Sequence, residues 1–231
     1  MYNYDHKKMA TLLGELLQRH LEPEQWAWAS EQVQVGSRLN SAFGLAPRKT
    51  GRHTIRLDNT DCQSLDTARS GFYPAGWDTS RLFRVWLLQQ LPATSVTAYR
   101  ESISRLFRTA EMNELVALYS ALPLLAYPEE WRLQCAEGIR SNIMDVLRAI
   151  ICNNPYPAEQ LDEGAWNQLV LKAFFVGLPP DEMMGLEERL NGNLVDTLQD
   201  YVDERRAAGR SVHPRIPELI ATFSGRHHQA Y

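Results

Sequence analysis

Apolar residues recur every three or four positions along most of this chain of 231 residues. This spacing places them on one face of an α-helix. The pattern is clear at the start, in "KKMATLLGELLQRHL", and it returns between prolines and capping residues to about residue 220. No segment alternates convincingly with the period of two that a half-buried strand requires, although "HTIRLD" at 53–58 is compatible with a short extended piece. The sequence therefore predicts an all-α fold of about ten helices.

The short linkers between these helices limit how they can be arranged. Many contain a proline, such as Pro23, Pro92 and Pro128, and short connections favour antiparallel helix pairs. A HEAT-like stack and an irregular orthogonal bundle both satisfy this pattern. We expect one all-α domain over residues 1–223, followed by a polar tail at 224–231 that we expect to be disordered.

Residues 44–77 have no helical period and contain four glycines. The expectation is a long irregular loop, which in a compact domain is usually functional or mobile. Its first part, "APRKTGRHTIRLD", concentrates basic residues in an otherwise mildly acidic chain. One interpretation is an anion-attracting loop formed by Arg48, Lys49, Arg52 and Arg56. The other is a solvated crossover with no binding role.

The segment "EGAWNQLVLKAFFV" at 163–176 predicts a helix that is apolar on nearly all sides, with Asp162 as its N-cap and Gly177 ending it. Such a helix is usually buried. Lys172 then lies at least partly inside the protein, where an unpaired ammonium costs several kcal/mol. Lys172 therefore needs a carboxylate partner, a route to water along its own stem, or a polar cavity.

Polar residues upstream supply candidate partners for Lys172. The stretch "CAEGIRSNIMDVL" and the asparagines after it suggest one buried network made of Glu137, Arg140, Asn142, Asn154, Asn167 and Lys172. Two interpretations remain open: amides that cap helix ends beside a Lys–Glu pair, or a small-molecule pocket. If the protein is an enzyme, Lys172 would act as electrophile or Schiff-base donor, with Glu137 or Glu111 as the base.

Motifs for most known chemistries are absent from the sequence. There is no HExxH, GxSxG, Walker loop or GxGxxG, and the six histidines lack metal-ligand spacing. Asp196, Asp200 and Glu204 recur every four residues, but no second acidic motif accompanies them, so a solvated face explains them better than Mg²⁺. We expect neither a metal nor a cofactor.

Charge and cysteine usage narrow the class of protein further. The net charge of −4 argues against a nucleic-acid binder. None of the three cysteines forms a CxxC pair, which favours free thiols in a reducing compartment. No apolar run resembles a signal peptide or reaches the length of a membrane span. These features predict a cytoplasmic protein.

Extended stretches of the chain resemble the EboA family of bacteria, over roughly residues 78–217. They are "AEMNELVALYSALPLLAYPEEW", "AEGIRSNIMDVLRAIICNNPYPAEQLDEGAWNQLVLKAFF", "GLEERLN" and "DYVDERRAAGRSVHP". The resemblance implies a helical component of a gene cluster that makes or moves a metabolite precursor toward the periplasm, alongside prenyltransferase-like and isomerase-like barrel proteins. It brings no established reaction or catalytic residues. Our candidate ligand-binding residues within these stretches are Arg140, Asn142, Asn154, Tyr156, Asn167 and Lys172, with Arg205 and Arg206 as further candidates.

These observations together favour a binding or accessory protein that recognises a polar metabolite precursor or a partner protein of the same cluster. The alternative is an enzyme acting on a polar or phosphorylated precursor. A third interpretation is a scaffold for the cluster's enzymes.

Overall fold

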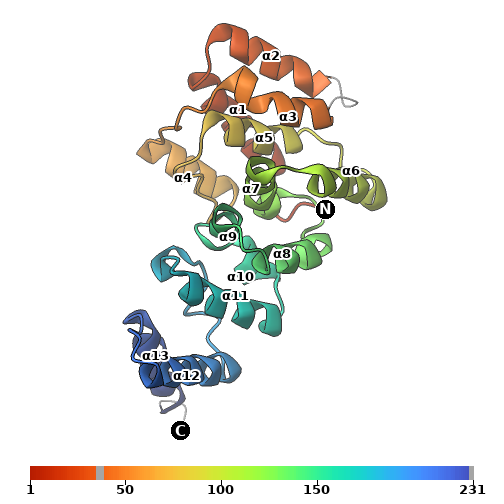
Figure 1. Cartoon of the computed structure of the whole chain (residues 1–231). Coiled ribbons are helices and arrows are strands. Elements are labelled where there is room, and N and C mark those ends of the chain that lie inside the picture. The colour runs from red at the N-terminus through yellow and green to blue at the C-terminus, as the bar shows by residue number, and fades with distance from the viewer. Residues whose placement is uncertain (35–38, 229–231) are drawn as a thin grey trace.

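The computed structural model describes residues 1–34 and 39–228 of the chain (Figure 1). Within them lie thirteen α-helices and no β-strand, so the all-α prediction is confirmed and the predicted number of helices was low. The "HTIRLD" segment contributes only an isolated bridge between Thr54 and Asp78. The helices are α1 (His6–Arg19), α2 (Pro23–Gln34), α3 (Leu39–Thr50), α4 (Asn59–Ala68), α5 (Thr79–Leu88), α6 (Val96–Thr109), α7 (Met112–Ala121), α8 (Arg132–Ile139), α9 (Met144–Ile151), α10 (Tyr156–Gln160), α11 (Glu163–Val176), α12 (Gly192–Ala207) and α13 (Arg215–His228).

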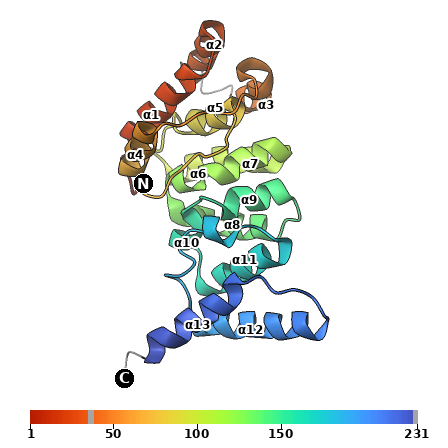
Figure 2. The same ribbon diagram turned by 90° about the vertical axis from the view of Figure 1, so that its left-hand side faces the viewer.

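The helices form an elongated stack and not an orthogonal bundle. From one end to the other, α3 packs on α5, α5 on α7 and α7 on α9, and then α8 and α9 meet α11, which meets α12 (Figures 1 and 2). Helices α3 and α5 run antiparallel, because Arg84 of α5 donates to the Phe43 carbonyl whereas Thr79, five residues earlier, donates to the Thr50 carbonyl. Helices α12 and α13 close the far end.

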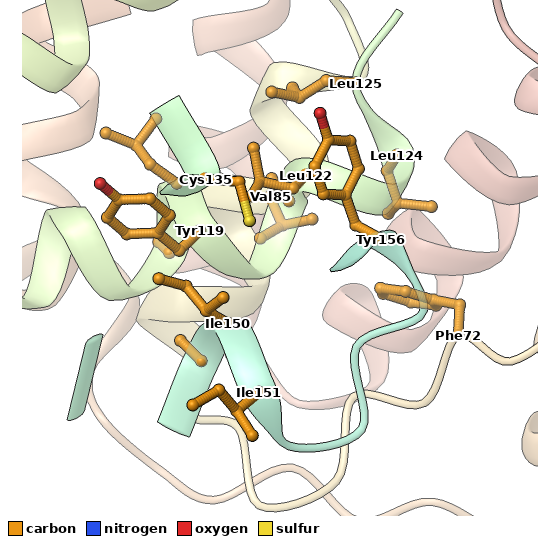
Figure 3. Packing of buried hydrophobic residues seen from close by; sticks show 14 of the residues in the cluster. Phe72, Val85, Tyr119, Leu122, Leu124, Leu125, Cys135, Ile150, Ile151 and Tyr156 are labelled. Atoms are coloured by element: carbon orange, nitrogen blue, oxygen red, sulfur yellow. The ribbon is translucent and has the colours of Figure 1, made fainter. Parts of the chain in front are cut away.

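The middle of the stack is closely packed. Tyr119 of α7 lies against Cys135 of α8 and Ile150 of α9 (Figure 3). Gly138 makes this approach possible, since a Cβ there would lie 2.5 Å from Ile150 and 2.6 Å from the Tyr119 ring. Every residue of α5 except Arg81 is buried. The centre of the stack therefore holds α5, α7 and α9 rigidly against one another.

The prediction of an irregular loop over 44–77 was wrong, because two helices lie inside it. Helix α3 continues through Pro47 to Thr50, and α4 begins after the capping residue Asp58. Both escaped notice because α3 buries mainly alanines around Phe43, and α4 buries only Leu65 and Ala68. Small apolar residues give a weak periodic signal. The irregular parts are 51–58 and 69–78.

The C-terminal helix α13 extends further than the sequence predicted. Helix α13 continues to residue 228, into the segment expected to be a disordered tail, and residues 229–231 lie outside the described part. No helix in the described part combines the length and apolar character needed to cross a membrane.

Candidate functional site

The predicted buried network does not form around Lys172, which has one of its expected partners. Helix α11 buries the expected stripe of Trp166, Leu169, Val170, Ala173 and Phe174, but its opposite side carries the 70% exposed Phe175. Lys172 is half-buried, and its Nζ donates to Oδ1 of the exposed Asn142 at 3.0 Å. Lys172 thus makes a hydrogen bond to an expected partner, but the pair is not inside the protein.

The other members of that network lie apart from Lys172. Glu137 and Arg140 are exposed at the end of α8. Asn167 of α11 exchanges hydrogen bonds with Asn191, the N-cap of α12, at 2.9 and 3.2 Å. Glu111 begins α7, where its backbone N–H donates to Glu114. Among the described residues no carboxylate lies within 4.0 Å of Lys172, so the structure does not bring Lys172 together with Glu111 or Glu137.

Asn154 and Tyr156 are buried and have structural partners. The Asn154 amide donates to the Ala149 carbonyl at 2.9 Å and the Tyr119 carbonyl at 3.2 Å, while its oxygen accepts from the Tyr156 backbone. The Tyr156 hydroxyl donates to the Pro128 carbonyl at 2.6 Å. These bonds tie α7, α9 and α10 together. Asn154 also lines a cavity, described next.

Two adjoining cavities of about 390 and 330 Å³ form one groove across α5, α7 and α9, because both are lined by Gly76, Arg81 and Arg148. We call it the arginine groove. Its charged end is lined by Arg52, Asp78, Ser80, Arg84, Asn113 and Asp145, among others, and its neutral end chiefly by Phe72, Tyr73, Trp77, Ser120, Cys152, Asn153, Asn154 and Glu182. A volume of this order suits a small-molecule ligand.

Arg81 lies where the two ends meet. Asp78 caps α5 and accepts from the Arg81 backbone N–H at 2.7 Å, which fixes the start of the helix. The Arg81 guanidinium donates through Nε to the Ser120 hydroxyl at 2.8 Å and lies 4.5 Å from the centre of the Trp77 ring. Within residues 1–34 and 39–228, no carboxylate lies within 4.0 Å of it and Nη1 has no protein acceptor.

Burial lowers the pKa of Arg81 to about 10, and Asp78 and Asp145 oppose this shift. A pKa near 10 still leaves the guanidinium charged at neutral pH. Arg81 is therefore a partly desolvated cation with one free donor edge at the groove. Asp78 and Asp145 line the same cavity, and an external anion at this edge would complete the hydrogen bonds of Nη1.

Arg52 is exposed, and the two remaining arginines of the groove have closer acidic neighbours. Arg84 is 3% exposed and donates to the Phe43 carbonyl at 2.9 Å and to Ser80 at 3.1 Å, with Glu114 at 3.8 Å. Burial lowers the pKa of Arg84, and Glu114 opposes that effect. Arg148, at the rim, has Glu182 at 3.8 Å. Arg81 is thus the guanidinium best placed to receive an external anion.

The predicted basic loop contributes one residue to this groove. Arg48, Lys49, Arg52 and Arg56 are all exposed, with the first two in the last turn of α3. Only Arg52 of these four lines the charged end. The structure thus associates one residue of the loop with the arginine groove, together with Asn154 from the predicted ligand-binding set, whereas Lys172 lines a separate cavity between α11 and α12.

The sequence analysis missed Arg81, Arg84 and Arg148. A usable signal was present in "WDTSRLFRVWLL", where two arginines three positions apart interrupt an otherwise apolar helix. This is the same anomaly that drew attention to Lys172. Applied to 79–88, it would have identified Arg84 as a buried cation and Arg81 as a half-buried one.

Nucleophilic and metal chemistry find little support in the described residues. Burial, with Glu182, raises the pKa of the Cys152 thiol to about 12, so this groove residue is protonated and weakly nucleophilic at neutral pH. No group of three or more His, Cys, Asp or Glu side chains in the described residues is placed to hold a metal ion. What the groove offers is hydrogen-bond donors and positive charge beside aromatic rings.

Fold and cavity together define a helical-stack protein with an arginine-lined groove at its centre. Comparison with protein families then gives its relationship: the family described as "Metabolite traffic protein EboA" matches residues 9–221, nearly the whole chain. The chain belongs to the EboA family. No curated protein and no solved structure gave a match. The match covers the N-terminal helices as well as the stretches in which the resemblance was first seen.

Proposed function

We propose that this protein binds an anionic small molecule in the arginine groove and serves metabolite traffic as a binding protein, without turnover of its own. The observation that carries the proposal is Arg81, a partly buried guanidinium with no carboxylate within 4.0 Å in the described chain and a free Nη1. The family description supports the traffic role.

The chemistry of the groove favours an anion as ligand. A guanidinium presents a planar fork of donors that matches carboxylate and phosphate oxygens. Arg52, Arg84 and Arg148 add positive charge around Arg81, and these four arginines outnumber Asp78 and Asp145 in the same cavity. Arg81 and Arg84 lie on the well-packed α5 and are held by hydrogen bonds to Ser120 and the Phe43 carbonyl before a ligand arrives, which reduces the ordering cost of binding.

The setting of this activity remains part of the proposal. We place it in the cytoplasm, in a pathway that delivers a precursor toward the periplasm, on the family resemblance and the free cysteines. We prefer binding to the enzyme alternative, because Lys172 contacts Asn142 and neither Glu137 nor Glu111.

A direct test is the response of thermal stability to inorganic phosphate at low ionic strength. Ligands that bind only the folded state raise its stability by mass action. We expect phosphate to raise the Tm of the wild-type protein and to have little effect on Arg81→Gln. The matched control is Arg100→Gln, an exposed arginine of α6 paired with Glu130 at 2.9 Å. An equal phosphate response in all three proteins would overturn the proposal.

A second candidate function, docking of a partner protein, is favoured by the surface around Phe175. We call it the α11–α12 patch: Gln168, Leu171, Lys172, Phe175, Tyr201, Glu204, Arg205 and Arg210. It places an exposed aromatic ring among three cations and one carboxylate. An acidic segment with an apolar anchor complements such a surface. The proposed partner is a protein of the same cluster, prenyltransferase-like or isomerase-like.

This candidate is tested by co-purification with those two classes of protein. The double variant Lys172→Glu/Phe175→Ser should lose the partner. Leu133→Ser, which alters an 81% exposed side chain on α8, should retain it. Retention by the double variant would exclude the patch as the docking site.

A further inference from the structure

The arginine groove has two chemically different ends, and they meet at one residue pair. Arg52 and Arg84 lie at the charged end, while Tyr73 and Asn153 lie at the neutral end. Arg81 and Arg148 line both cavities. A ligand that fills the groove therefore passes the Arg81 guanidinium whichever end it enters.

The neutral end is built as an aromatic wall with polar groups beside it. Trp77 and Phe72 are 5% and 3% exposed and pack edge to face, whereas Tyr73 next to them is 41% exposed. Asn153, opposite this loop, is held at a φ of 51°, and its backbone N–H donates to the Glu182 carbonyl at 2.8 Å. The Tyr73 ring is thus available to a ligand while its neighbours hold the loop in place.

Gly76 leaves the passage between the ends open. It lines both cavities, and a Cβ at this position would meet no atom within 4 Å. The loop therefore puts no side chain between the arginines and Tyr73 at this point. One molecule can extend from the charged end into the neutral end.

We propose that the ligand is a phosphate monoester with an uncharged, ring-sized body: the phosphate lies among the arginines and the ring against Tyr73. This inference rests on the proposed function and specifies its ligand class. Guanidinium groups reach the charged end from α5, α9 and the α3–α4 connection, which suits a tetrahedral group with three terminal oxygens better than a planar carboxylate. Glu182 disfavours a second negative charge at the neutral end, whereas at the charged end four arginines outnumber the carboxylates Asp78 and Asp145.

The test is calorimetric titration of wild-type protein with methyl phosphate, phenyl phosphate and benzoate at low ionic strength. Phenyl phosphate should bind about fivefold more tightly than methyl phosphate, the size of effect expected for one aromatic contact. Benzoate, which has the ring but a planar carboxylate, should bind more weakly than phenyl phosphate. Tyr73→Ala should lose the preference for phenyl phosphate while keeping its affinity for methyl phosphate.

Leu133→Ala serves as the control, because it truncates an 81% exposed apolar side chain on α8 that does not line the groove. It should retain the full preference for phenyl phosphate. Three results would each overturn the two-part ligand and leave anion binding intact. They are equal affinities for the two phosphates, an affinity for benzoate equal to that for phenyl phosphate, and a preference for phenyl phosphate that survives Tyr73→Ala. Failure of every phosphate to bind would overturn the proposed function itself.

Discussion

Arg81 on α5 and Lys172 on α11 are both half-buried cations within helices that read as almost entirely apolar, yet the fold buries the two helices to very different extents. All of α5 apart from Arg81 is buried, and the Arg81 guanidinium is partly desolvated. Lys172 is half-buried, with Phe175 exposed one turn away. The contrast shows that apolar composition alone does not decide what a helix buries.

Position in the stack accounts for the difference. Helix α5 is packed against α1, α2, α3 and α7, whereas α11 lies toward the end of the stack and meets α8, α9 and α12 (Figure 2). Neighbours on more sides remove more of a helix from water. A cation in the centre then bears a desolvation cost that a cation near the end avoids.

The largest expected effect separates a buried ring on α5 from an exposed ring on α11. Phe83 of α5 is fully buried and packs against Trp28 and Trp86. Phe83→Ala should lower the free energy of unfolding by about 3–5 kcal/mol. Phe175→Ala on α11 should change it by less than about 0.5 kcal/mol. Urea denaturation of the two variants measures both, and similar losses would show that the stack has no such centre.

The second prediction uses the reactivity of the Cys152 thiol to test whether the groove wall is desolvated. Because burial raises the pKa of Cys152 to about 12, its thiolate is scarce at pH 8, and alkylation should accelerate about tenfold per pH unit up to pH 11. A Cys62→Ser background isolates this thiol, since Cys135 is fully buried. Iodoacetamide labelling followed by mass spectrometry measures the rate. A plateau below pH 10 would contradict a desolvated groove wall.

The third prediction concerns two helical glycines in the same two regions. Gly138→Ala adds a Cβ 2.5 Å from Ile150 and should cost about 1–3 kcal/mol by overpacking. Gly164→Ala in α11 finds only an ordinary contact of 3.6 Å and should stabilise the fold by about 0.5–1 kcal/mol, since alanine favours helix. Thermal unfolding of both variants distinguishes the signs. An increase in stability for both variants would mean that α8 shifts to accommodate the new methyl group.

The smallest expected effect tests whether Arg81 serves ligand binding and not the stability of the fold. Without ligand, Arg81→Met should change stability by no more than about 1 kcal/mol, because it removes a desolvated charge as well as the bonds to Ser120. Lys172→Met should be equally mild. Only Arg81→Met should lose the phosphate response. A loss of several kcal/mol from Arg81→Met alone would indicate a structural role.

The parts of the fold that were predicted correctly are those set by interactions between residues close together in the sequence. Asp162 caps α11 by accepting from the Ala165 N–H at 2.8 Å, and Gly177 ends that helix at a φ of 73°. The buried stripe of α11 was also predicted correctly. By contrast, α3 was missed because Pro47 lies inside it and its buried face is mostly alanine. Which side of α11 faces solvent depends on distant helices, which periodicity does not report.

The candidate site was predictable only in pieces, for a geometric reason. Arg52 and Asn154 were each singled out in the sequence, Arg52 in a basic anion-attracting loop and Asn154 among the candidate ligand-binding residues. The groove joins residues from 52 to 182, and no local pattern places segments so far apart in sequence beside one another. Arg81 was identifiable as an unusual residue, but the absence of a carboxylate beside its guanidinium became visible only in three dimensions.

The central claim is that an anion binds at Arg81, and arginine Nε–H NMR during a phosphate titration tests it most directly. The Arg81 Nε–H donates to Ser120, and this hydrogen bond should slow its exchange with water enough for observation. Arg81→Lys identifies its resonance, and Arg205, whose Nε donates to the Ser211 carbonyl in the α11–α12 region, provides the comparison. The account predicts a saturable shift of the Arg81 resonance with that of Arg205 unmoved. A saturable shift confined to Arg205, or none at Arg81, would contradict it.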